Sequence, residues 1–563
     1  MGKAFFGLFL FFTISLQSQE NYPKDVFSPP LDIPLVLAGN FGELRSNHFH
    51  AGIDIKTQQR QGLPVHSIAD GTVVRIKVAH WGYGKVLYVA HPNGFTSVYG
   101  HLSKFSPTIE KYVKNLQYKK KSYEVEAFPV YGELKVQKGE LIAYSGDTGS
   151  SGGPHVHFEI RSTITEKPIN PLLFGFDVRD ATDPTVLELF GYPLSDDAEI
   201  NQSNDRTQIL FRKQADGSYL ADPVHAIGTI GFGINAYDRQ DLAANKNGVY
   251  SVQQLVNGKL YTDYEFETFS FSEGRYINTL IDYAYYVQHQ DRIQKCFRVP
   301  GNRLSIYRAL VNDGKIVVNE GLTYNVEIQL RDLEDNLTKL VIPVEGKREE
   351  LKVYKDIEKT DQYVIAKKPN NFDLGIAKVY FPANTFYDDF YIDLRKGNDT
   401  VTIHNNTVPC HRNFTVTFDA SKYSKEEQQQ LFIARLDKYR KPDYITTYKR
   451  GSNFTARTRA LGTFTLAKDS IAPKISAKNF KEKQWLNNYH YLSLRITDDL
   501  SGINTYNATL NGEWILMEYE PKTNTLTYNF DDKILDKKEC KLKVVVTDNV
   551  GNTSTFTRTF FRK

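Results

Sequence analysis

Three short segments in the first third of the chain combine histidine with a carboxylate or with glycine in patterns that could do chemistry. They are His50-Ala51-Gly52-Ile53-Asp54, Tyr99-Gly100-His101-Leu102 and His155-Val156-His157-Phe158-Glu159. Two imidazoles and one carboxylate suit a zinc ion and leave an open position for water. Two further imidazoles would remain for proton transfer. The set therefore predicts metal-assisted hydrolysis.

The His155 segment alternates as a β-strand does. His155, His157 and Glu159 would share one face, and the apolar residues between them would share the other. Two strand residues advance the chain by roughly 7 Å, whereas a zinc–nitrogen bond measures about 2.0–2.1 Å. One ring can therefore bind a metal while the other reaches only a water beside it. The spacing predicts one ligand and one base rather than two ligands.

His50 and Asp54 pose a different geometric problem. On a straight strand they would lie roughly 13 Å apart, too far to share one ion. Their spacing suits a helix, but Gly52 lies between them, and Ile53 and Ile55 alternate as in a strand. We therefore expect a bend or bulge around Gly52, where the missing Cβ permits unusual dihedral angles.

The distribution of histidines supports a metal site over an ordinary pair on a strand. Eight of the 13 histidines lie between positions 48 and 157. Those without a partner motif are interpreted as structural or surface residues: His48, His66, His80 and His91. The segment Gly149–Gly153 fits Gly-x-Ser-x-Gly, but a nucleophile elbow needs a following helix. A strand pattern follows instead, so this segment is interpreted as a flexible loop.

The order His-x-x-x-Asp, His-Leu, His-x-His resembles the lysostaphin-type (LytM-like, M23) zinc endopeptidases of peptidoglycan. The resemblance runs from about Asp32 to Asn170 and includes local segments such as Gly62-Leu63-Pro64-Val65 and Gly146-Asp147-Thr148-Gly149. It covers less than a third of the chain. Adaptor relatives of this fold lose one or more metal ligands; here every member is present, which favours an active enzyme.

The resemblance implies a role for each of these side chains. His50, Asp54 and His157 would bind one zinc ion per catalytic domain. His155 would be the general base that activates the zinc-bound water. His101 would bind or protonate the tetrahedral oxyanion, although the two unligated histidines could exchange these roles. Two alternatives stay open for Glu159, which either orients a ligand or is simply solvated.

One departure from the family pattern lies between Leu102 and Val136. Residues 105–129 intervene where relatives have a short connection, and Ile109–Leu116 within them is expected to form a short helix. Two interpretations stay open. The insertion either borders the groove and selects substrate, or it is a solvated surface excursion.

The first residues of the chain predict export. Residues 1–19 combine a basic start, an apolar run and a small polar exit, which is typical of a signal peptide. No later apolar run is long enough to span a bilayer. The expected location is periplasmic, secreted or in the cell envelope.

A net charge of +4 over 563 residues demands no nucleic-acid partner. Three scattered cysteines, Cys296, Cys410 and Cys540, are expected to be buried small residues.

The predicted fold class is mainly β. An antiparallel LytM-like catalytic domain (residues 20–178) would precede β-sandwich, immunoglobulin-like domains at 179–346 and 469–563. Residues 347–468 would form one sandwich or two small ones, with a short helix in 424–436. The two flanking modules form a faint repeat whose acidic turns predict either calcium binding or ordinary turn chemistry.

These patterns favour a zinc endopeptidase that cuts peptidoglycan peptide crosslinks. The runner-up is a LytM-like scaffold that regulates another envelope hydrolase while its own groove is shut. A third candidate is a general secreted protease, which needs an open groove. The expected partners are peptidoglycan peptide stems and crosslinks, and docking of an envelope protein through the β domains is left open.

Overall fold

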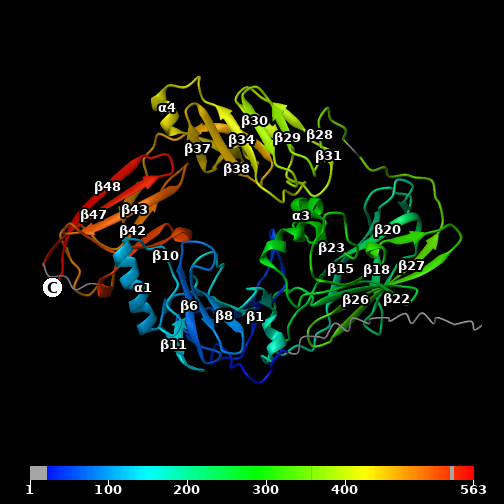
Figure 1. Cartoon of the computed structure of the whole chain (residues 1–563), viewed down its shortest axis with the longest axis horizontal. Coiled ribbons are helices and arrows are strands. Elements are labelled where there is room, and N and C mark those ends of the chain that lie inside the picture. Colours follow the sequence, from blue (N-terminus) through cyan, green and yellow to red (C-terminus); the bar gives the residue numbers. More distant parts are fainter. Residues whose placement is uncertain (1–21, 357, 533–537) are drawn as a thin grey trace, which may run out of the picture.

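The computed structural model describes residues 22–356, 358–532 and 538–563. The predicted signal peptide, residues 1–19, lies outside this part of the chain. Strands dominate the fold and most pair antiparallel, which confirms the predicted mainly-β class (Figure 1). Four hydrophobic cores follow one another along the sequence. We call the residues that carry them the first (22–178), second (179–346), third (347–468) and fourth (469–563) domains. The predicted limits of these domains stay predictions.

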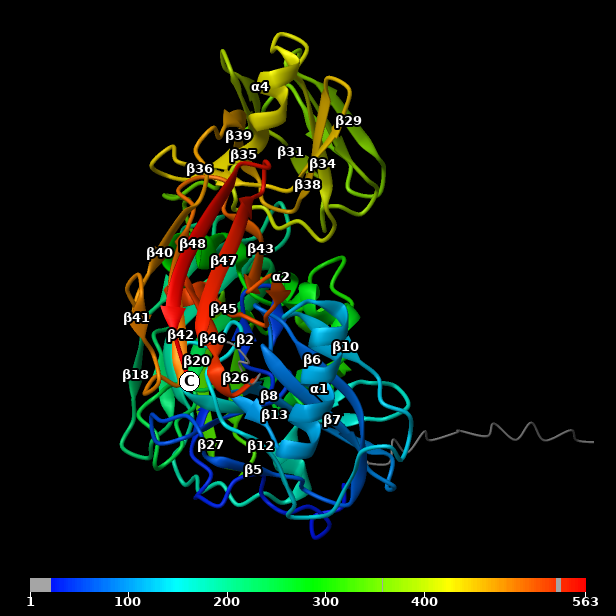
Figure 2. The same cartoon turned by 90° about the vertical axis from the view of Figure 1, so that its left-hand side faces the viewer.

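The four domains are arranged so that the chain returns to its beginning. In Figure 1 the path runs from the first domain at the bottom, through the second and third, to the fourth at the left. The fourth domain then lies beside helix α1 (Pro107–Lys120) of the first, and the view turned by 90° in Figure 2 agrees. Regions about 400 residues apart in sequence are therefore neighbours.

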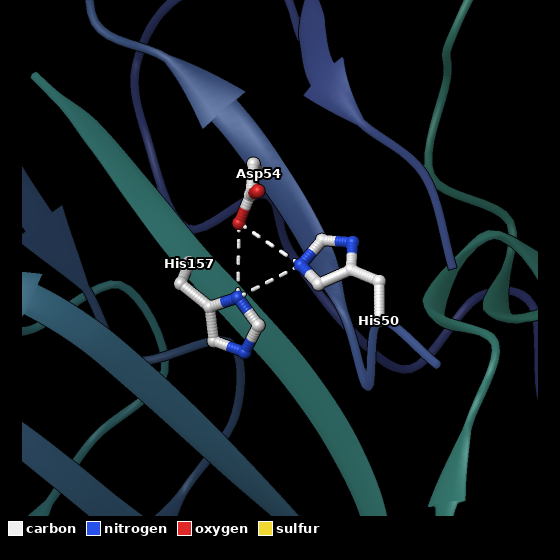
Figure 3. Close-up of side chains that lie close together, drawn as sticks. All are labelled: His50, Asp54 and His157. Atoms are coloured by element: carbon white, nitrogen blue, oxygen red, sulfur yellow. Dashed lines mark hydrogen bonds and ion pairs between the residues drawn. The ribbon is translucent and has the colours of Figure 1, made fainter. Parts of the chain in front are cut away.

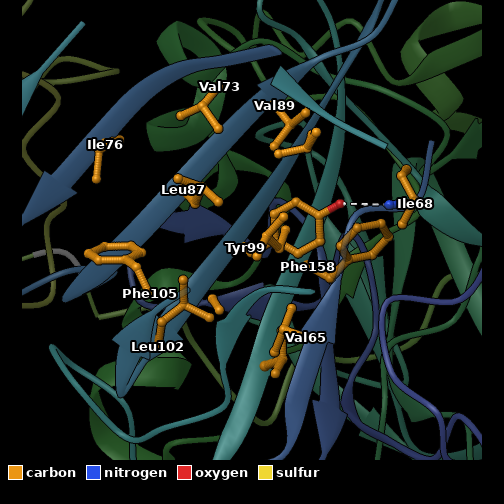
Figure 4. Close-up of a cluster of buried hydrophobic side chains, with 14 of the residues drawn as sticks. Val65, Ile68, Val73, Ile76, Leu87, Val89, Tyr99, Leu102, Phe105 and Phe158 are labelled. Carbon is orange, nitrogen blue, oxygen red and sulfur yellow. Dashed lines mark hydrogen bonds between the residues drawn. The ribbon is translucent and has the colours of Figure 1, made fainter. Parts of the chain in front are cut away.

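The first domain is built on an antiparallel sheet that carries all three histidine segments. Its strands run in the order β1 (Leu37–Gly39), β4 (Ile53–Lys56), β13 (His155–Ser162), β8 (Phe95–Leu102), β7 (Lys85–Ala90), β6 (Gly71–Val78) and β10 (Val125–Ala127). A second, three-stranded sheet joins β5 (Pro64–His66), β12 (Leu141–Tyr144) and β9 (Lys104–Phe105). The core between them contains the apolar face of β13, as the alternation predicted (Figure 4).

Helix α1 forms most of the insertion at residues 105–129. Pro107 occupies its first turn, where a missing N–H costs nothing, and Lys121 ends it in the left-handed conformation. The helix therefore begins two residues before and ends four residues after the predicted Ile109–Leu116. Its buried face packs into the first domain through Ile109 and Val113.

The second domain is built on a 13-stranded sheet. Its main path runs through β17 (Thr207–Ile209), β15 (Thr185–Pro193), β20 (Val224–Tyr237), β27 (Leu337–Gly346), β26 (Thr323–Arg331), β21 (Ser251–Val256), β22 (Lys259–Glu265) and β24 (Tyr307–Leu310). Strand β27 runs parallel to β20, while the other neighbours along this path are antiparallel.

The third domain encloses one hydrophobic core between two five-stranded sheets, so a single sandwich is present. The sheets contain β29 (Asn370–Asp373), β30 (Ala377–Phe381), β34 (Phe414–Asp419), β38 (Asn453–Thr458) and β37 (Thr447–Arg450), and β32 (Leu394–Lys396), β33 (Thr400–Ile403), β39 (Gly462–Lys468), β35 (Leu431–Leu436) and β36 (Pro442–Tyr444). The short helix expected within 424–436 is present. Helix α4 spans Lys425–Gln430 behind a capping box at Ser424, and β35 follows at once because its apolar residues enter the core.

The fourth domain is a smaller sandwich. One sheet joins β40 (Lys474–Ala477), β42 (Tyr491–Thr497), β46 (Thr525–Asn529) and β45 (Glu518–Glu520), and the other joins β41 (Gln484–Trp485), β48 (Thr553–Phe561), β47 (Glu539–Asp548), β43 (Ile503–Leu510) and β44 (Glu513–Trp514). Cys296, Cys410 and Cys540 lie buried in the second, third and fourth cores respectively. Among the helices described, none is both long and apolar enough to cross a bilayer.

The fourth domain contacts the first through both polar and apolar groups. The Lys85 ammonium group lies 2.9 Å from the Glu518 carboxylate, and Tyr118 of α1 meets Trp514 edge to face at 5.3 Å. Leu516 is buried in the core of the first domain. Between the two domains lies a cavity of about 520 Å³ whose lining includes Thr148.

Candidate metal centre

The structure brings together His50, which lies just before β4, Asp54 on β4 and His157 on β13 (Figure 3). Asp54 Oδ1 lies 3.1 Å from His50 Nε2 and 2.9 Å from His157 Nδ1. The two nitrogens are 3.0 Å apart. All three residues are buried, with exposures of 3–4%. The side chains expected to share one ion therefore converge, although 107 residues separate His50 from His157.

Strand pairing explains two members of this group. Strand β13 pairs with β4 so that His157 stands opposite Asp54, and with β8 so that His157 stands opposite Gly100. Facing residues on paired strands have neighbouring side chains, so the register alone places His157 beside Asp54.

His50 reaches the site because the chain bends before β4, as predicted, with Gly52 at the bend. Gly52 does not adopt a positive φ. Instead, a Cβ at this position would lie 2.3 Å from the carbonyl oxygen of Phe158 in β13, so only glycine permits this close approach of the two backbones.

Hydrogen bonds at the outer nitrogens fix the tautomers of both histidines. His50 Nδ1 lies 2.7 Å from the Asn40 carbonyl oxygen, and His157 Nε2 lies 2.7 Å from Glu159 Oε1. These oxygens can only accept, so each outer nitrogen carries the proton and each inner nitrogen presents a lone pair. With Asp54 Oδ1, three acceptor atoms therefore face one another within 3.1 Å. Such a group needs a proton or a cation between its members, and its donors fit zinc.

The electrostatics of the group also indicate a place for positive charge. Burial alone would raise the pKa of Asp54. The nearby His50, His155 and His157 lower it by more than this, so the pKa lies well below its ordinary value. Burial lowers the pKa of His157, but Asp54 and Glu159 outweigh it and raise the pKa to about 9. Without a metal, a proton on His157 would supply the missing charge. A bound metal ion would replace that proton.

His155 and His101 lie beside the group without belonging to it. His155 Nδ1 donates to the Gly153 carbonyl oxygen at 2.8 Å, and its Nε2 faces Asp54 Oδ1 at 3.4 Å. His101 Nδ1 donates to the Thr148 carbonyl oxygen at 2.8 Å, and the two rings are 4.8 Å apart. Both rings therefore carry a proton on Nδ1. Burial, with His157 and His155 nearby, lowers the pKa of His101 to about 3.

With this geometry established, comparison with known families identifies the domain. The sequence model of peptidase family M23 matches residues 48–118 and 118–171, and that of the Zu5-like domain matches residues 361–469. The first domain is an M23 peptidase domain.

Named relatives share this M23 domain. DD-carboxypeptidase/endopeptidase Mpg of Neisseria meningitidis serogroup B is 35% identical over 139 residues, which are 25% of this chain and 26% of that protein. Peptidoglycan DD-endopeptidase ShyA of Vibrio cholerae serotype O1 is 31% identical over 111 residues, 20% of each chain. The catalytic domain of the prophage-encoded M23 protein EnpA from Enterococcus faecalis, solved as a point mutant, matches 26% of this chain and 98% of its own, with 23% identity and a TM-score of 0.20. The chain thus spans about a quarter or less of the curated relatives it matches.

The second domain holds the His50 segment of the M23 domain. Phe49 and Ala51 flank His50, yet both belong to the hydrophobic core of the second domain. The Phe49 ring lies 5.6 Å from that of Phe266 and 5.3 Å from that of Phe269. One histidine of the candidate metal group is therefore positioned by packing outside its own domain.

Other contacts of the centre were not predicted from the sequence. Arg45 donates to Asp54 Oδ2 at 2.7 Å, and Tyr83 stacks on His157 with ring centroids 4.8 Å apart. The carbonyl groups that hold the histidines have no sequence signature, since every residue carries one. Arg45 and Tyr83 lie near the motifs, but no residue pattern links them to their partners.

Two open alternatives are settled by burial. Glu159 is fully buried and accepts from His157 and, at 2.5 Å, from Arg161, so it is not solvated. The α1 insertion is not a simple solvated excursion, because it packs against the fourth domain through Tyr118. The remaining histidines of this region stay outside the centre: His48 is exposed and bonds to the Ser46 carbonyl oxygen, while His66, His80 and His91 contact other groups.

Proposed function

We propose that this chain is a zinc metalloendopeptidase of the cell envelope that cleaves the peptide crosslinks of peptidoglycan. The observation that carries the proposal is the convergence of three acceptor atoms, on His50, Asp54 and His157, with two free imidazoles beside them. The M23 family model covers these residues, and the similar proteins include ones named DD-carboxypeptidase/endopeptidase and peptidoglycan DD-endopeptidase. Peptidoglycan stems and crosslinks are the proposed substrate, and export to the periplasm or beyond is the proposed location.

In this proposal His50, Asp54 and His157 hold the zinc ion. When bound there, zinc would polarise the scissile carbonyl group and lower the pKa of water. Glu159 keeps His157 in the tautomer whose Nδ1 faces the site, and the Asn40 carbonyl group does the same for His50 Nε2. Such outer hydrogen bonds orient the ligands and raise their basicity.

His155 and His101 carry the proposed proton transfers. At neutral pH His101 is uncharged, because its pKa is lowered to about 3. One unprotonated Nε2 takes a proton from the attacking water, and the same ring then donates it to the leaving amine. His155 is proposed for this step, since its side chain is the most exposed of the three histidines paired with Asp54, at 14% against 4% for His50 and His157. His101 is proposed to stabilise the oxyanion, which requires its Nε2 first to take up a proton, with exchange of the two roles left open.

The test is digestion of purified sacculi with the zinc-loaded protein, followed by mass spectrometry of the released fragments. The expected result is conversion of crosslinked dimers to monomers by the parent protein. His155→Ala should abolish it, lowering the rate by about 10²–10⁴-fold. Release that requires a second hydrolase would support the regulator instead. Cleavage of unrelated proteins such as casein at a similar rate would support a general protease.

A further inference from the structure

A second cluster of carboxylates lies in the second domain, away from the zinc centre. Asp180 precedes β15, Asp238 follows the last residue of β20, and Asp332 follows the last residue of β26. Their ligand atoms all lie within 4.8 Å of one another. Asp238 and Asp332 are each only 4% exposed. Three turns thus direct acidic groups to one buried point.

The negative charge of this cluster is not neutralised by the protein. Among the described residues, no lysine, arginine or histidine forms an ion pair with any of the three carboxylates. Burial, followed by the nearby Asp180 and Asp332, raises the pKa of Asp238 to about 8. Buried like charges are costly unless a proton or a cation lies between them.

An independent observation points to a ligand here. Gln240 is 6% exposed, yet its Oε1 has no hydrogen-bond partner, and Asp238 Oδ1 lacks one as well. Gln240 and the three aspartates line one cavity of about 30 Å³. A space of this size holds a single water molecule or ion. Buried acceptor oxygens without partners are rare, and here two of them belong to residues that line this space.

We propose that Asp180, Asp238, Asp332 and the side-chain oxygen of Gln240 form a calcium site. The donor set contains oxygen only, which selects a hard cation over zinc. Calcium accepts carboxylate and amide oxygens in irregular arrangements, whereas magnesium demands near-octahedral geometry and retains several waters. The fourth domain repeats the motif with Asp469, Asp498 and Asp548, in keeping with the repeat between the two modules.

The proposed calcium site is next to Asn40, whose backbone carbonyl group bonds to His50. Its cavity is also lined by Asn40 and Gly248. The Asn40 side chain donates to the Gly248 carbonyl oxygen at 2.6 Å and accepts from the Gly248 N–H at 3.0 Å. The Asn40 carbonyl group in turn fixes His50. Calcium would thus brace the turn that supports one zinc ligand; this consequence, unlike the site itself, rests on the proposed function.

Calorimetric titration of the chelator-stripped, zinc-reloaded full chain with calcium chloride tests the proposal. The parent should bind one more calcium ion than Asp238→Asn, with a dissociation constant of about 10⁻⁴ M. Asp335→Asn is the matched control, because Asp335 lies in the same turn as Asp332 but its side chain is 89% exposed. The fourth-domain cluster is present in every variant, so the difference isolates this site. Zinc content is measured in parallel, so failure of the zinc centre is recognised separately.

Thermal unfolding provides a second readout. About 10 mM calcium, roughly 100 times the expected dissociation constant, should raise the melting temperature of the second domain by about 5–10 °C in the parent and in Asp335→Asn only. If Asp238→Asn fails to fold, Asp180→Asn takes its place, because Asp180 is less buried. This variant should also show no calcium-dependent rise in melting temperature. Equal calcium stoichiometry in the parent and in Asp238→Asn or Asp180→Asn would overturn the proposal. Magnesium binding of similar affinity would also overturn it. So would a higher melting temperature of Asp238→Asn than of the parent when both are free of calcium, because that result indicates a proton shared between the carboxylates.

Discussion

The ring of Phe49 packs against the ring of Phe266, 5.6 Å away in the second domain. Phe49 immediately precedes His50, and Gly42 also meets Phe266, where an added Cβ would approach within 2.5 Å. The segment that supplies one proposed zinc ligand is therefore clamped from outside the M23 domain. The second domain thus contributes to the site rather than serving only as a spacer.

Because Phe49 packs against Phe266, Phe266→Ala should weaken zinc binding although Phe266 is not itself a proposed zinc ligand. The cavity should destabilise the second domain by about 3–5 kcal/mol, and the freed His50 segment should lower zinc affinity by about tenfold or more. Competition with a chromophoric chelator measures the affinity. Phe464→Ala, in the buried core of the third domain, is the matched control. Equal zinc affinities in the two variants would show that the second domain does not position His50.

A second prediction concerns Glu159, the buried partner of His157. In Glu159→Gln the charge that orients His157 is lost, and Arg161 keeps no charged partner in this pair. Zinc affinity should fall by about 10–100-fold. Glu126→Gln removes a comparable arginine partner in the same domain, where the pair with Arg75 is about one-third exposed, and should leave zinc affinity unchanged. A normal affinity in Glu159→Gln would contradict the orienting role.

Zinc binding should release a proton from His157. Its pKa in the metal-free protein is raised to about 9, so at pH 7 the ring is charged and must lose a proton to bind metal. Calorimetry in buffers of different ionisation enthalpy should show about one proton released at pH 7 and almost none well above pH 9. Apparent affinity should rise about tenfold per pH unit below pH 9. A binding enthalpy independent of buffer would contradict this assignment.

The same shift predicts the pH dependence of stability in the metal-free protein. The folded pKa of His157 lies above its ordinary value of 6.5. The folded state therefore binds this proton more tightly than the unfolded state, and the stabilisation is complete below about pH 6.5. It should be lost as the pH rises through about 9. Urea unfolding at pH 6 and pH 9 measures this loss, and saturating zinc should abolish its His157 contribution.

Lys522 of the fourth domain contacts the loop that leads into His155. Its ammonium group donates to the carbonyl oxygens of Ser151, at 3.2 Å, and Asp147, and forms a partly exposed ion pair with the Asp147 carboxylate at 3.3 Å. Lys522→Ala should therefore make amide hydrogen exchange of residues 146–153 about two- to fivefold faster, the range expected for a partly exposed ion pair. Lys541→Ala, at an exposed position of β47, is the control. Unchanged exchange in the loop would show that this docking contact does not restrain it.

Much of the metal centre could be predicted because strand periodicity and ligand chemistry are local. The alternation of His155, His157 and Glu159 follows from the pleat of β13, and the bend at Gly52 follows from the distance that His50 and Asp54 must close. The packing of Phe49 in another domain could not be predicted, since a single phenylalanine in the sequence does not indicate which residues it will contact. The short helix within 424–436 could be expected, but its end at Gln430 could not, because it depends on the burial of Leu431–Leu436 in the third core.

The most direct test of the account is the zinc content of two variants whose sites lie two residues apart, measured by elemental analysis of purified protein. His155→Ala should retain one zinc ion per M23 domain while losing hydrolysis, because His155 is proposed to move protons rather than to bind metal. His157→Ala should lose the ion. Equal zinc contents in the two variants, or an empty His155→Ala protein, would contradict the central claim.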